Sequence, residues 1–243
     1  MKRKIAIIGG GIVGASAAYY LSTLSGHEQL AVTLYDDGTG QATSAAAGII
    51  SPWLSKRRNK QWYQLAKDGA SLLMQLAREA NLATDVYAQT GTIITRTDPT
   101  DMSKLWELAK QRAAEDPDMG EIQQLTAEEV KEKIPLLSKG QPGVYVSGGA
   151  RIDGAKFVDD LLTQASQVNL TVKHGKVALD EAGHIVTPAG TKRFDQIIIA
   201  AGAWLPDLLA PLGMKVAVRP QKGQLIQLNV QDFQDYENMP VLM

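Results

Sequence analysis

The sequence predicts an α/β protein in which a parallel sheet with flanking helices is interrupted by a mixed-sheet α+β region. Three observations support this prediction: an apolar strand that enters a glycine-rich turn, a second strand after the next helix, and a later strand that is apolar on both faces. Strands joined by a helix form βαβ units, and strands buried on both faces are typical of parallel sheets. The mixed-sheet region is expected to be incomplete, because the chain stops on an apolar, strand-like stretch.

The first elements are a strand over 4–8, a helix over 12–24 and a strand over 31–35, which together form a compact βαβ unit. The basic start followed by an apolar stretch superficially resembles a signal peptide. Glycines interrupt that stretch and no cleavage pattern follows, so a buried strand entering a glycine turn explains it better. No run reaches the roughly eighteen apolar residues of a membrane span. We therefore expect no membrane span and a cytoplasmic location.

The rest of the chain is predicted to contain shorter helices and strands. Helices are recognised from the helical spacing of apolar residues and from caps, and strands from alternating or continuous apolar residues between turn residues. The predicted helices cover 61–81, an exposed segment at 102–115, a short segment after the cap Thr126, and 154–168. The predicted strands cover 91–95, 144–146, 170–172, 176–179, 196–200, 215–218 and 224–229. The strand over 196–200 is expected to lie in the centre of the parallel sheet.

Composition excludes several function classes. The 243 residues include 25 basic and 26 acidic side chains, and this net charge of −1 gives no reason to propose a nucleic-acid partner. Cysteine is absent, which excludes disulfides, thiolate metal sites, a cysteine nucleophile and a cysteinyl-linked cofactor within this chain. His27, His174 and His184 lie in polar stretches without metal-ligand spacing, so no metal site is predicted.

Residues 9–14, with the sequence GGGIVG, satisfy the pattern G-x-G-x-x-G directly after a strand and at the start of a helix. Gly9 permits the tight turn, Gly11 lets the backbone approach a pyrophosphate, and Gly14 allows close packing of helix and strand. The helix N-terminus then faces the negative charge of the pyrophosphate. This Rossmann-like fingerprint predicts a bound dinucleotide; a glycine-rich turn without a ligand is the alternative.

Asp36 strengthens this interpretation, because it ends the second strand about 20 residues after the glycines, where a carboxylate accepts hydrogen bonds from an adenosine ribose. Asp37 beside it leaves the assignment open, and capping of a turn is the alternative role for either residue. An acidic residue here argues against NADP, whose extra phosphate it would repel. The fingerprint alone does not distinguish NAD from FAD.

Residues 43–52, with the sequence TSAAAGIISP, resemble a motif of the D-amino-acid oxidase and glycine oxidase family of flavoproteins. The resemblance covers essentially the whole chain, with further matches at 91–94, 125–129 with Pro135, 149–153, 197–204 and 219–224. It implies a Rossmann-like FAD-binding domain interrupted by a mixed-sheet substrate domain. The implied segments are 1–86 and 150–216 for the FAD-binding domain, and 87–149 and a truncated 217–243 for the substrate domain.

The resemblance also implies which residues contact FAD. Ile12 and Val13 would lie with the glycines at the pyrophosphate, and Asp36 and Asp37 at the adenosine. Thr43, followed by Ser44, would bind the pyrophosphate through its hydroxyl or backbone. The isoalloxazine ring would lie against Ala47, Gly48 and Ile49. Val177 would contact adenine through its main chain, and the turn at Ala201 and Gly202 completes the set.

Plainer roles remain as alternatives for several of these residues. The segment 43–48 could be a simple helix start capped by Thr43, and Val177 an ordinary core residue. Trp204 is interpreted as packing and Lys222 as a solvated turn residue. Some flavoproteins of the wider superfamily attach FAD through a histidine in this segment, where this sequence has Ala45, or through a cysteine. The resemblance therefore implies a non-covalent FAD.

By the same resemblance, the expected function is oxidation of the C–N bond of an amino acid or secondary amine, with hydride transfer to the flavin and O2 as the electron acceptor. The alternatives are a flavin enzyme for a hydroxy acid or polyol, and a non-catalytic FAD-binding subunit of a larger amine-oxidising complex. The family's carboxylate-binding arginine has no match before Met243, so no catalytic residue is assigned. The chain is expected to be the N-terminal part of a longer oxidase, and a homo-oligomer is left open.

Overall fold

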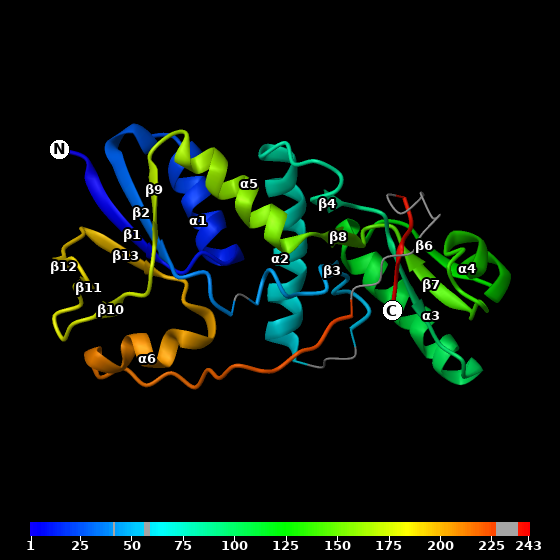
Figure 1. The fold of residues 1–243 in the computed structure, drawn as a ribbon. Coiled ribbons are helices and arrows are strands. Elements are labelled where there is room, and N and C mark those ends of the chain that lie inside the picture. Colours follow the sequence, from blue (N-terminus) through cyan, green and yellow to red (C-terminus); the bar gives the residue numbers. More distant parts are fainter. Residues whose placement is uncertain (41, 56–58, 227–237) are drawn as a thin grey trace. The chain divides into compact units, whose positions relative to one another are not determined.

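A computed structural model describes residues 1–40, 42–55, 59–226 and 238–243. The described chain divides into two compact units, the first formed by residues 1–46 and 154–226, the second by 47–153 and the C-terminal residues 238–243 (Figure 1). The unit formed by 47–153 is thus inserted into the sequence of the first unit. The expected boundaries near residues 87, 150 and 217 separate an FAD-binding domain from a substrate domain. This division of the chain stays a prediction.

A four-stranded parallel sheet forms the centre of the first unit, with the strand order β13-β1-β2-β9. Its strands are β1 (Arg3–Ile8), β2 (Leu30–Asp36), β9 (Leu170–His174) and β13 (Gln196–Ile199). Side chains of successive strand residues point to opposite faces. Ile7, Val32 and Leu34 are therefore buried on one face, whereas Ala6, Ile8 and Tyr35 are buried on the other.

Helices cover the first face, and shorter elements cover the second. On the first face, α1 (Ile12–Thr23) and α5 (Gly154–Ser166) contribute Ala18 and Ala165 to the core. The second face packs against α6 (Leu205–Leu209) and an antiparallel sheet of β10 (Ala178–Leu179), β11 (Ile185–Thr187) and β12 (Gly190–Lys192). Three short 3-10 helices complete the unit, at His27–Gln29, Gly202–Trp204 and Ala210–Leu212.

The described part of the second unit contains two further sheets. A mixed sheet has the order β14-β5-β7-β6, with β5 (Thr92–Thr95), β6 (Ile122–Leu125), β7 (Gly143–Val146) and β14 (Val241–Leu242). Within it β14 runs parallel to β5, and the other pairs are antiparallel. An antiparallel sheet has the order β3-β8-β4, with β3 (Ile49–Ile50), β4 (Tyr87–Ala88) and β8 (Ala150–Ile152).

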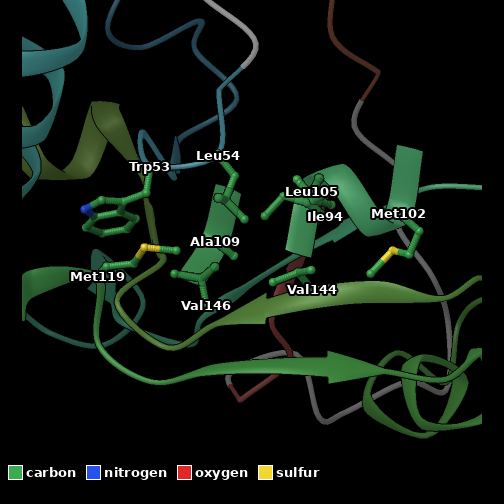
Figure 2. Close-up of a cluster of buried hydrophobic side chains, with 9 residues drawn as sticks. All are labelled: Trp53, Leu54, Ile94, Met102, Leu105, Ala109, Met119, Val144 and Val146. Atoms are coloured by element: carbon green, nitrogen blue, oxygen red, sulfur yellow. The ribbon is translucent and has the colours of Figure 1, made fainter. Parts of the chain in front are cut away.

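The core of the second unit lies between the mixed sheet and α3 (Pro99–Glu115), as Figure 2 shows. Met102, Leu105 and Ala109 of α3 pack there with side chains of β5 and β7. Among its described residues, this unit also has the helices α2 (Lys60–Glu79) and α4 (Ala127–Lys133), with a 3-10 helix at Pro117–Met119. Thr126 and Glu129 form a reciprocal capping box at the start of α4, as the sequence predicts.

The parallel sheet, the βαβ start and the mixed sheet of the second unit agree with the predicted α/β fold class. Three local expectations are wrong. The helix over 102–115 is not simply exposed, because its residues at helical spacing are buried in the core. The segment 215–218 and residues 224–226 form no strand, since they have no pairing partner in the described chain; Val216 packs against the core of the first unit, the other residues are exposed, and residues 227–229 lie outside the described chain. Finally, β13 is an edge of the described sheet rather than a central strand.

Within the described ranges, no helix combines the length and hydropathy needed to cross a bilayer.

Candidate functional site

The carboxyl ends of the parallel strands carry most of the residues that the sequence singles out in the first unit. The glycine turn follows β1, Asp36 ends β2, Val177 lies just after β9, and Ala201 comes shortly after β13. Parallel strands place these ends at one edge of the sheet, which is where open α/β sheets bind ligands.

Two glycines of the fingerprint are required by the packing of the protein itself. A Cβ at Gly9 would lie 2.4 Å from the carbonyl oxygen of Ala200, and Gly9 also has a φ of +106°. A Cβ at Gly14 would lie 1.9 Å from the carbonyl oxygen of Gly9. The glycine turn, the end of β13 and the first turn of α1 therefore approach one another as closely as backbones can. No side chain larger than hydrogen fits at either position.

Gly11 differs from these two glycines. A Cβ there would meet only the hydroxyl oxygen of Thr43, at 3.3 Å, and its φ of −70° suits any residue. Gly11 is also the N-cap of α1, without a side chain to cap the helix, and no acidic residue lies in the first turn. A helix N-terminus carries partial positive charge and unsatisfied N–H groups. The open approach beside Gly11 therefore leads to an end of the helix that attracts anions.

Thr43 links the second motif to this helix end. Its hydroxyl oxygen accepts a hydrogen bond of 3.0 Å from the backbone N–H of Ile12, the first residue of α1. The residues from Ala42 to Ala46 form a turn and a bend rather than a helix, so the alternative of a plain helix start is wrong. Ser44 is exposed in the same turn. The side chain of Val13 in α1 is 65% exposed, which leaves this end of the helix accessible.

The carboxylate of Asp36 is fixed by backbone donors on both sides. One oxygen accepts a hydrogen bond from the N–H of Gly10, and the other accepts one from the N–H of Gly38 at 2.6 Å. Gly10 was not assigned a role from the sequence, although it occupies a free position of the motif. A Cβ at Gly10 would lie 2.9 Å from a carboxylate oxygen of Asp36, so the glycine between Gly9 and Gly11 is the signal that could have revealed this contact.

Asp37 has the turn-capping role that the sequence left open. One of its carboxylate oxygens accepts hydrogen bonds from the hydroxyl of Thr39 at 2.7 Å and from the N–H of Thr39 at 3.0 Å. These bonds, the hydroxyl first, lower the pKa of the fully exposed Asp37 carboxyl, and Lys176 adds a smaller attraction. Asp37 therefore shapes the loop after β2, whereas Asp36 contacts the glycine turn.

The other candidate residues of the first unit make packing contacts, and these contacts account in part for the residue type at each position. Val177 is half-buried and packs against the core beneath β1, as the alternative for this residue expected. Ala201 lies against Gly9, whereas Gly202 has a φ of +52° and open space around its Cβ position. Trp204 packs against the backbone of Gly40, where an added Cβ would lie 2.7 Å from the indole ring.

Ala47, Gly48 and Ile49 belong to the second unit. Gly48 is buried with a φ of +67°, and a Cβ there would lie 1.9 Å from the carbonyl oxygen of Ile152. The N–H of Ile152 donates a 2.8 Å hydrogen bond to the carbonyl of Gly48. The glycine is thus required for packing β3 against β8. Ala47 is exposed, and so is 41% of the Ile49 side chain.

The family model described as DAO, FAD-dependent oxidoreductase, matches residues 4–242. The chain belongs to this family of FAD-dependent oxidoreductases. It is 39% identical to the uncharacterized oxidoreductase YurR of Bacillus subtilis, with 98% of this chain aligned. It is 27% identical to a glycine oxidase of Pseudomonas aeruginosa over 93% of this chain.

A solved structure of the same fold is that of iminodiacetate oxidase from Chelativorans. It superposes with a TM-score of 0.90 and 31% identity, covering 98% of this chain. The DAO-family chain described here spans 64% of the Bacillus relative, 62% of the Pseudomonas enzyme and 66% of the iminodiacetate oxidase chain.

The residues of this DAO-family chain fit an FAD pyrophosphate. The open space beside Gly11, the start of α1 without a capping side chain at Gly11, and the anchored carboxylate of Asp36 supply the space, the positive end and the ribose acceptor that a dinucleotide needs. Within the described ranges, no three His, Asp or Glu side chains are grouped so that they could hold a metal ion.

Proposed function

We propose that the chain binds FAD non-covalently and contributes to oxidation of the C–N bond of an amino acid or secondary amine. The observation that supports FAD binding most directly is the contrast among the glycines. Packing explains Gly9 and Gly14 without a ligand, but it does not explain Gly11, which leaves the positive end of α1 open. A pyrophosphate that approaches this end of the helix explains why residue 11 is a glycine.

In this proposal, Asp36 binds the adenosine ribose and the turn around Thr43 and Ser44 lies beside the pyrophosphate. Gly11, Ile12 and Val13 present backbone to the phosphate groups, and Gly202 with Ala201 bounds the site near β13. Ala47, Gly48 and Ile49 border the isoalloxazine ring. The bound flavin supplies the hydride acceptor, and the protein orients the substrate and excludes competing reactions.

The substrate class is proposed from the relatives. Glycine oxidase and iminodiacetate oxidase are named for amines that carry carboxylates, and both align with more than nine-tenths of this chain. We infer a small amine or amino acid as the substrate, with O2 as the electron acceptor. No observation in the described residues favours a hydroxy acid or polyol.

The test uses the purified full-length protein. We expect the protein to show a visible flavin spectrum, and we expect denaturation to release the flavin into solution. We also expect release of peroxide with at least one of glycine, sarcosine, iminodiacetate, proline or D-amino acids. Absence of a flavin spectrum, even after FAD is added, would refute the binding proposal. Bleaching of the flavin by a hydroxy acid while every amine is inert would refute the proposed substrate class.

A further inference from the structure

One side-chain contact joins two loops at the carboxyl edge of the parallel sheet. Trp204 follows β13 and Gly40 follows β2, and the outer edge of the indole ring packs against the backbone of Gly40. In the strand order β13-β1-β2, β1 lies between the strands that precede these two residues (Figure 1). Neighbouring strands lie about 4.8 Å apart, so the contact bridges roughly 10 Å at the end of β1. The glycine turn that follows β1 therefore lies between the two supports of the contact.

The indole side of this contact is firmly held. Trp204 ends a 3-10 helix, and its backbone N–H donates a 3.0 Å hydrogen bond to the carbonyl of Ala201. Ala201 and Leu205, on either side of it, both pack against the core on the second face of the sheet. The side chain of Trp204 is itself 41% exposed. The indole is thus an accessible ring on a backbone that the core fixes.

The loop 37–40 is the side of the contact that is free to move. All four of its residues are exposed, and Gly40 has a φ of +59°, a region that glycine enters without steric cost. The hydrogen bonds of Thr39 join it to Asp37 within the loop, whereas Trp204 reaches the loop from a distant part of the sequence. Exposed segments with few packing contacts open at the lowest free energy. Loss of the indole should therefore let the loop open more often.

This loop lies between two residues of the proposed cofactor site. Asp36, at the ribose, directly precedes it, and Thr43, whose hydroxyl accepts the hydrogen bond of Ile12, lies shortly after it. A Cβ at Gly154 would lie 2.3 Å from the carbonyl oxygen of Thr43, so Thr43 packs closely against the start of α5. Both ends of the segment are therefore fixed, and Trp204 supports its middle. An FAD that extends from the ribose at Asp36 to the pyrophosphate at α1 runs along this loop.

We propose that Trp204 is a positioning residue that holds the loop 37–40 across the end of β1 and thereby sets the rates at which FAD enters and leaves the site. The inference rests on the proposed function, because it assumes that FAD occupies this edge of the sheet. The contact joins two segments of protein and uses no atom of the cofactor. It has to break whenever the loop opens, for entry as well as for exit, so it slows both processes by the same factor.

The test measures FAD exchange in the full-length protein and in its Trp204→Ala and Trp204→Phe variants. Association is followed by the quenching of FAD fluorescence on mixing with flavin-free protein, and dissociation by exchange of bound FAD for excess 8-chloro-FAD, which has a different spectrum. In Trp204→Ala we expect both rate constants to rise about tenfold, while their ratio, the dissociation constant, changes less than about threefold. Trp204→Phe, whose ring is shorter than the indole, should give intermediate rate constants.

Two controls separate this role from general damage. Leu24→Ala removes a side chain that is 59% exposed at the opposite end of α1 in the same unit, and it should leave both rate constants unchanged. Circular dichroism of the flavin-free variants checks that each is folded at the temperature of the measurement. If Trp204→Ala is not folded, Trp204→Phe carries the comparison.

Unchanged rate constants in a folded Trp204→Ala would overturn the inference. A faster dissociation alone, with the dissociation constant raised by the same factor, would also overturn it, because Trp204 would then contact the cofactor itself. Loss of structure in both Trp204 variants would assign the residue a role in folding and would overturn the inference as well. The proposed function fails separately, if the wild-type protein takes up no FAD.

Discussion

At the residue scale, the glycine turn contains glycines that the fold requires and a glycine that only a ligand would require. Gly9 and Gly14 touch backbone oxygens so closely that any side chain would displace a strand or a helix, whereas the space beside Gly11 contains one hydroxyl. All three glycines satisfy the same sequence pattern. Their different surroundings give each position its own expected response to substitution.

Replacing each glycine with alanine tests this separation. Gly9→Ala and Gly14→Ala should each lower the free energy of unfolding by about 2–4 kcal/mol, because the methyl group overlaps backbone atoms. Gly11→Ala should change stability by less than about 1 kcal/mol and weaken FAD binding about tenfold or more. Urea denaturation of the flavin-free protein and fluorescence titration with FAD provide the two measurements. Equal loss of stability in all three variants would contradict the assignment.

The sequence predicted the residues at this scale unevenly. Motif spacing was enough to single out Gly9, Gly14 and Asp36, because a fixed backbone geometry demands particular residues at fixed distances. It could not decide between the binding and capping roles of Asp37, since the contact with Thr39 depends on how the loop folds. Nor could it reveal that Trp204 packs on Gly40, because that contact depends on the order of the strands that precede the two residues.

At the scale of elements, a buried polar contact anchors the segment after β3 to the end of α3. The indole N–H of Trp53 donates a 2.8 Å hydrogen bond to Asp116, whose carboxylate also lies 3.6 Å from the ammonium of Lys67 in α2. Trp53 is 2% exposed and Asp116 is 5% exposed. The contact therefore holds three parts of the second unit together within its core.

Trp53→Phe keeps an aromatic ring there and removes the donor. We expect the free energy of unfolding to fall by about 1.5–3 kcal/mol, the range for a hydrogen bond to a charged group. Trp106→Phe is the matched control, because Trp106 packs against the same core without a hydrogen bond of its indole in the described contacts. The midpoint of urea unfolding, followed by circular dichroism, should fall more for Trp53 than for Trp106. A similar shift in both variants would assign the effect to lost packing.

Elements with their own local signals were predictable, and those that depend on partners were not. The cap at Thr126 predicted the start of α4, and the helical spacing of apolar residues over 61–81 predicted α2. The segment 215–218 has strand-like composition, but a strand forms only where another strand supplies its hydrogen bonds. The position of β13 at an edge of the described sheet also depends on neighbours rather than on its own apolar residues.

At the scale of the whole molecule, cofactor binding should appear as added stability. A ligand that binds only the folded state and is present at 100 times its dissociation constant stabilises that state by about 2.7 kcal/mol. FAD should therefore raise the unfolding temperature of the flavin-free full-length protein, and NADP should raise it much less, because Asp36 repels the 2′-phosphate. Differential scanning fluorimetry checks both. An equal rise with NADP would refute the role of Asp36.

The parallel sheet of the first unit has a consequence for how the protein emerges from the ribosome. The backbone N–H of Lys4, near the start of β1, donates a hydrogen bond to the carboxylate of Asp195, which lies 191 residues later in the chain. At about 5–20 residues per second, β1 waits roughly 10–40 s during synthesis before β13 exists to cover its edge. The inserted unit is translated almost entirely within that interval. One edge of the apolar strand β1 therefore stays unpaired in the nascent chain while another unit folds, a period in which chaperones can act on it.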